Sequence, residues 1–136
     1  MGSLNILKPK SQDDIRKNFS DIIFWYRFIN TTNTPLDWIK YRLDDDHVAE
    51  QAARVGMPVK DSYMLWEKQL IYMMCKLETM NGPLSKKINS TIKGSFLRGG
   101  NHFIDWHSVY DRIWEIIHRE YHSANKLYYS HTGKNL

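Results

Sequence analysis

The fold is decided by one long stretch near the end of the chain, which reads DWHSVYDRIWEIIHREYHSANKLYY from Asp105 to Tyr129. Apolar residues recur in it every three or four positions, which is the spacing of one face of an α-helix. The stretch therefore predicts a long amphipathic helix that buries one side in a core. The residues expected on this inner face are Trp106, Val109, Ile113, Ile116, Ile117 and Tyr121.

Three earlier segments show the same spacing and carry helix start and stop signals. The first helix is expected from Ser11 to about Asn30. The second starts at Thr34-Pro35 and runs to Arg54, with or without a break at Asp44 to Asp46, and Gly56 ends it. The third starts near Asp61 or Ser62 and ends at Asn81-Gly82-Pro83.

A weaker helical pattern from Leu84 to Lys93 leads into Gly94 to Asn101, which holds three glycines and predicts a loop. The sequence therefore predicts an all-α protein, a compact bundle of four to five helices with a Gly-rich basic loop before the last long helix. The length of 136 residues fits one domain. We expect a helical domain over 11–130, an N-terminal extension over 1–10 and a frayed tail over 131–136.

Composition excludes several classes of protein. The chain is 42% hydrophobic, but its longest apolar runs fall far short of the roughly 20 residues that cross a bilayer. The single cysteine, Cys75, excludes an internal disulfide framework and a cysteine-rich zinc site. No apolar signal-peptide core appears at the N-terminus, so we expect a cytoplasmic protein that is not secreted and has no membrane partner.

The positive charge is concentrated in one part of the chain. The net charge is +4, and no acidic residue occurs between Glu78 and Asp105. Basic side chains next to glycines can neutralise phosphates, and aromatic rings can stack on unpaired bases. The sequence thus predicts a binding or regulatory factor that contacts nucleic acid, or a nucleic-acid-handling complex, through this segment. An acidic protein surface is the alternative ligand. The simplest interpretation is a basic face that is solvated and binds nothing. The expected contacts are Lys86, Lys87, Lys93, Arg98, Phe96 and His102.

The last helix also carries a carboxylate and two imidazoles at helical spacing. Glu115, His118 and His122 lie three and four residues apart, so they project from neighbouring turns. Asp44 and His47 repeat the carboxylate-x-x-His spacing found in di-metal bundles. The remaining carboxylates are too few to complete such a site, so we expect a solvent-facing polar stripe and no metal.

Arg112 and His118 have five residues between them within the same predicted helix. This spacing resembles the Arg-x(4 to 6)-His element of the HEPN ribonucleases, which are all-α. The resemblance implies a ribonuclease in which His118 is the general acid or base and Arg112 steadies the phosphate.

No other familiar enzyme signature occurs: there is neither a Gly-x-x-x-x-Gly-Lys loop nor a Gly-x-Ser-x-Gly turn. This favours a non-enzymatic protein without a cofactor. Five Trp and eight Tyr residues leave a further alternative open. Exposed aromatics would suit a protein interaction or inhibitor module, such as a homodimer or a protein encoded by a phage or mobile element. The residues to watch are Trp25, Trp38, Trp106 and Trp114.

Overall fold

A computed structural model describes residues 12–30, 45–99 and 104–136. Within these ranges the chain forms helices and no strand, as the sequence predicts. The helices are α1 (Gln12–Ile29), α3 (Asp45–Val55), α4 (Leu65–Lys76), α5 (Pro83–Gly99) and α6 (Trp106–Thr132). None of them is long and apolar enough to cross a membrane.

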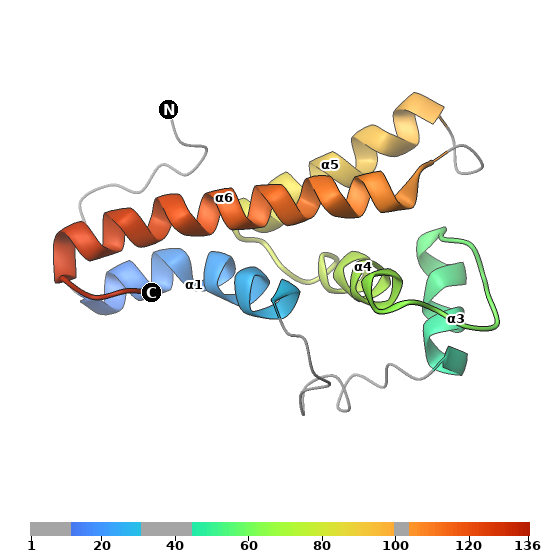
Figure 1. The fold of residues 1–136 in the computed structure, drawn as a ribbon, viewed down its shortest axis with the longest axis horizontal. Coiled ribbons are helices and arrows are strands. Elements are labelled where there is room, and N and C mark those ends of the chain that lie inside the picture. The colour runs from blue at the N-terminus through green and yellow to red at the C-terminus, as the bar shows by residue number, and fades with distance from the viewer. Residues whose placement is uncertain (1–11, 31–44, 100–103) are drawn as a thin grey trace.

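The helices form two layers. The long helix α6 runs beside α5, and α1 and α4 lie beneath this pair, as Figure 1 shows. The remaining helix, α3, packs against α4 at one end of the molecule. One surface of the α5–α6 pair is therefore covered by other helices and the opposite surface faces outward.

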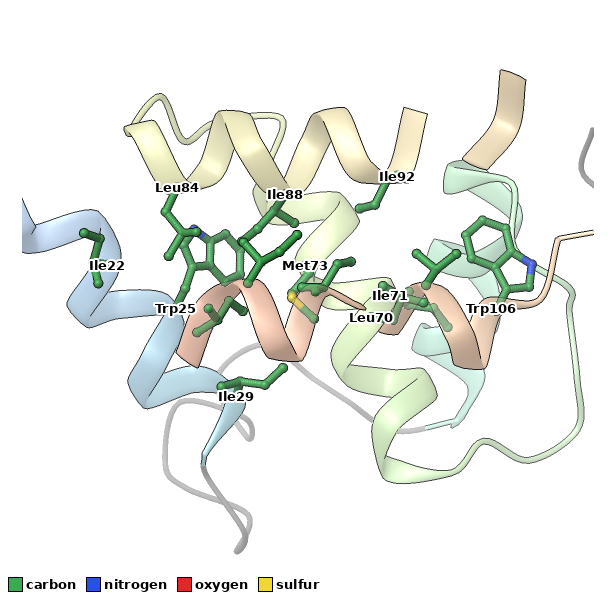
Figure 2. Packing of buried hydrophobic residues seen from close by; sticks show 14 of the residues in the cluster. Ile22, Trp25, Ile29, Leu70, Ile71, Met73, Leu84, Ile88, Ile92 and Trp106 are labelled. Carbon is green, nitrogen blue, oxygen red and sulfur yellow. The ribbon is translucent and has the colours of Figure 1, made fainter. Parts of the chain in front are cut away.

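The core lies between the two layers. Trp25 from α1, Leu70 and Met73 from α4 and Ile88 from α5 are almost fully buried, and their side chains point toward one another in Figure 2. The inner face of α6 completes the core with the residues that its periodicity predicts, apart from Tyr121, which is half-buried. This confirms the fold class.

Two described helices end at a glycine with left-handed backbone, and the first of these ends, Gly56, was predicted. Gly56 ends α3 with a φ of 85°, and the Met57 N–H donates to the Ala52 carbonyl at 2.9 Å. This is a Schellman arrangement, which requires a left-handed residue and so favours glycine. Gly133 ends α6 in the same way, with a φ of 70° and a bond from its N–H to the Tyr129 carbonyl.

Helix α5 differs from the expectation, because it continues through Gly94 to Gly99 instead of ending at Lys93. Phe96 explains the extension: its ring packs edge-on against Trp106, with ring centroids 5.5 Å apart. This contact outweighs the cost of about 1 kcal/mol for a glycine inside a helix. The rest of the predicted loop, from residue 100, lies outside the described residues.

The tail also differs from the expectation. The structure shows residues after α6 folding back onto the helix instead of fraying. The Leu136 N–H donates to Asn125 Oδ1 at 2.7 Å, and the Tyr121 hydroxyl donates to a main-chain oxygen of Leu136 at 3.1 Å. These bonds attach the last residues to two successive turns of α6.

Candidate nucleic-acid interface

Helix α5 carries two of the predicted cations on its outer surface. Lys86 and Lys93 are both exposed, and they lie seven residues apart. Seven residues make almost two helical turns, so both side chains leave the helix in nearly the same direction, about 10.5 Å apart along the axis. The opposite side of α5 packs Leu84, Ile88 and Ile92 into the core.

Helix α6 presents a second line of cations with the same spacing. Arg112, Arg119 and Lys126 are all exposed and lie seven residues apart from one another. They project away from the inner face that Ile113 and Ile117 bury in the core. The sequence analysis missed Arg119 and Lys126, although their seven-residue spacing was visible in the chain.

The two lines lie on neighbouring helices, because α5 and α6 pack side by side. Lys87 Nζ contacts Glu120 Oε1 at 2.7 Å, which marks the side on which the two helices meet. With about 100° of rotation per residue, each line lies on the side of its own helix that points away from the residues this helix buries. We call this surface the basic face: Lys86 and Lys93 of α5 and Arg112, Arg119 and Lys126 of α6.

The cations of the basic face have no carboxylate partner among residues 12–30, 45–99 and 104–136. The nearest acidic side chains on α6 are Asp111 and Glu115, both exposed. Asp111 lies on the side of α6 that His118 turns toward α1, whereas Glu115 is three residues from Arg112 and four from Arg119 and therefore lies beside the line of cations. Asp111 lies 3.3 Å from His107 Nδ1. Among the described residues, the basic face therefore holds five exposed cations and borders one exposed carboxylate, Glu115.

Lys87 belongs to the fold and not to this face. Its ammonium group binds Glu120, whose side chain is only 7% exposed, and its own side chain is 32% exposed. A buried carboxylate needs a partner, so Lys87 cannot leave Glu120 for an outside anion without cost. Sequence analysis cannot detect this pair, because the two residues are 33 positions apart.

The other predicted contacts have separate outcomes. Phe96 is half-buried and packs on Trp106, so it is not a free ring on the outer surface. Arg98 falls in the last turn of α5, and the placement of its side chain is not described. His102 lies outside the described residues.

The histidines of α6 are held by neighbouring groups. His118 Nδ1 lies 2.8 Å from the Trp114 carbonyl oxygen, and Nε2 lies 3.0 Å from Asn30 Oδ1 at the end of α1. The Trp114 ring stacks on the imidazole with centroids 3.6 Å apart. Among the described residues, no group of three His, Cys, Asp or Glu side chains is arranged to hold a metal ion. His118 therefore connects α6 to α1.

The pair that suggested a ribonuclease lies on one helix, as the sequence predicts. Arg112 and His118 are six residues apart on α6, which separates their directions by about 120° around the axis. Arg112 points outward on the basic face, and His118 points toward α1. The spacing within α6 is that of the motif itself, so the ribonuclease interpretation stays a prediction.

Comparison of the chain with models of known protein families, with curated proteins and with solved structures finds no match. The functional argument accordingly depends on the geometry of the basic face.

Proposed function

We propose that this protein is a small binding factor without enzymatic activity, which contacts the phosphate backbone of nucleic acid through the basic face. One observation carries the proposal: five exposed Lys and Arg side chains lie along the neighbouring helices α5 and α6 with no carboxylate partner among the described residues. Long cationic side chains on such a surface neutralise phosphates and release bound counterions.

The basic face favours binding that depends little on base sequence. Its cations are spread over two helices, and contacts to phosphate fix the position of a protein on a nucleic acid without reading the bases. Such a factor would act inside the cell, which agrees with a chain that has one cysteine and six methionines. Its role would be accessory or regulatory, beside the enzymes that process the nucleic acid.

The test is the salt dependence of affinity for a fluorescein-labelled 20-base-pair duplex, followed by fluorescence anisotropy. Neutralising three to five phosphates gives a log-log slope of roughly −2.7 to −4.5. Arg119→Gln should reduce the magnitude of this slope by about one, and Arg112→Gln with Arg119→Gln by about two. Lys134→Gln is the matched control, because Lys134 is an exposed cation outside the basic face.

Two results would contradict the proposal. One is the absence of duplex binding at 50 mM salt, and the other is an affinity that does not respond to salt. Binding of polyglutamate with equal affinity and the same dependence on Arg119 would favour an acidic protein surface as the natural ligand.

A second candidate function is self-association through exposed apolar groups. Trp114 is 42% exposed, and Val59, Met64 and Leu65 are exposed close together in sequence at the start of α4. Exposed aromatic and aliphatic side chains of this kind occur at protein interfaces. Light scattering across a concentration series distinguishes this function, because a dimer would double the mass and Met64→Ser would abolish the change.

A further inference from the structure

A hollow of about 190 Å³ opens beside the basic face, where α3, α4 and α5 meet. Apolar and polar residues both line it, and the apolar ones are Val55, Met74, Leu77, Ile92 and Phe96. Small-molecule sites usually enclose about 300–1,000 Å³, so this hollow fits one planar ring system and not a whole cofactor.

The rim of the hollow is polar. Lys93, Asn89, Arg54 and Glu78 surround the opening. Arg54 binds both carboxylate oxygens of Glu78, at 2.6 and 2.8 Å, so these two charges neutralise each other. The Glu78 contact raises the pKa of Arg54, which keeps the guanidinium charged. The remaining cation at the rim is Lys93, which also belongs to the basic face.

Asn89 adds a hydrogen-bonding group without a partner. It is half-buried, and its side chain makes no hydrogen bond to any of the residues that the structure describes. An amide offers two donors and one acceptor oxygen, which matches the mixed donor and acceptor edge of a nucleobase. Phe96, almost two turns further along α5, contributes an aromatic ring to the same lining.

We propose that this hollow receives one unstacked base of the bound nucleic acid. The base would lie against Phe96 and Met74, its edge would bond to the Asn89 amide, and Lys93 would bind the adjoining phosphate. Charge complementarity and continuity with the basic face both favour a nucleotide, because Lys93 serves the two surfaces. This inference rests on the proposed function, and it specifies the substrate class as single-stranded or unpaired nucleic acid.

The experiment compares affinities of the full chain for a 12-nucleotide single strand and for a duplex of the same length, by anisotropy at 100 mM salt. Stacking one base on a protein surface corresponds to a preference for the single strand of about 5- to 150-fold. Asn89→Leu replaces the amide by an apolar group of nearly the same shape, and leucine suits a helix. It should lower single-strand affinity to the duplex level and leave duplex affinity unchanged. Ser130→Leu is the control, since Ser130 is exposed on α6, away from the hollow.

A second readout observes the base directly. A 2-aminopurine in the middle of the single strand should change its fluorescence when the unaltered protein or Ser130→Leu binds, and should not change with Asn89→Leu. Equal affinity of the unaltered protein for both nucleic acids, or the same 2-aminopurine signal with Asn89→Leu, would overturn this inference and leave the proposed function intact. Failure to bind either nucleic acid would overturn both.

Discussion

At the scale of single residues, neighbouring lysines on α5 have different roles. Lys86 is exposed on the basic face, and Lys87 holds the buried carboxylate of Glu120. Lys87→Met should lower the free energy of unfolding by about 1–3 kcal/mol. This is below the loss of roughly 3–5 kcal/mol for a fully buried pair, because Lys87 is partly exposed and solvent screens the interaction.

The matched control for this substitution is Lys86→Met. It should change the free energy of unfolding by no more than about 0.5 kcal/mol, because it alters an exposed site without a partner among the described residues. Urea unfolding of both variants measures the difference. Equal losses would show that the contact with Glu120 contributes nothing to stability.

Tyr110 makes stability depend on alkaline pH. Burial, with a smaller contribution from the Asp111 carboxylate, raises the pKa of Tyr110 to about 12. An unfolded tyrosine ionises near pH 10, so the folded state holds this proton more tightly. The contribution of Tyr110 is therefore complete below about pH 10 and is lost as the pH rises toward 12.

Tyr110→Phe should reduce the loss of unfolding free energy between pH 10 and 12. Tyr129→Phe, which alters an exposed tyrosine, should leave this loss unchanged. Urea midpoints at pH 8, 10 and 11 provide the measurement. Parallel curves for the unaltered protein and Tyr110→Phe would contradict the assignment.

At the scale of helices, the start of α5 is held by a residue of α1. Asp21 is buried, and it accepts hydrogen bonds from the Ser85 N–H, at 2.9 Å, and from the Ser85 hydroxyl. Trp25 Nε1 donates in turn to Ser85 Oγ at 2.8 Å. A carboxylate at a helix N-terminus satisfies free N–H groups and interacts favourably with the helix dipole.

Asp21→Ala should cost about 2–4 kcal/mol of stability, because it removes this cap and leaves buried donors without an acceptor. Gly82→Ala should also destabilise, since an added Cβ would lie 2.0–2.3 Å from Asp21 side-chain atoms. The double variant should cost less than the sum of the two, because the clashes with Cγ and Oδ2 of Asp21 disappear and only the clash with its Cβ remains. Urea unfolding of the four proteins tests this, with exposed Asp61→Ala as the control. Additive losses would contradict the contact.

Helix identity was predictable from local patterns, but the end of α5 was not. The spacing of apolar residues in α1 and α6 and the stop at Gly56 are properties of nearby residues. The continuation of α5 through Gly94 depends on Phe96 packing against Trp106, a partner from another helix. Glycine patterns predict a loop when no tertiary contact opposes them.

At the scale of the whole molecule, the same distinction applies to the candidate site. Lys86 and Lys93 were predicted from an acid-free segment, and both lie on the basic face. The different role of Lys87 could not be predicted, because it depends on the position of Glu120, which is fixed by the packing of α5 on α6. The contribution of α6 to the face appears once the two helices are placed side by side. The hollow near Asn89 needs three helices and has no signal in the sequence.

The outward placement of the basic face lets natural selection adjust ligand affinity separately from the stability of the fold. Its cations are exposed and none belongs to the buried apolar cluster, so gaining or losing one of them leaves the scaffold nearly as stable as before. The affinity for the ligand can therefore change in small steps under selection, while the residues between the two layers of helices stay constrained. Diversity among descendants of this chain should accumulate first on the surface of α5 and α6 that faces away from α1 and α4.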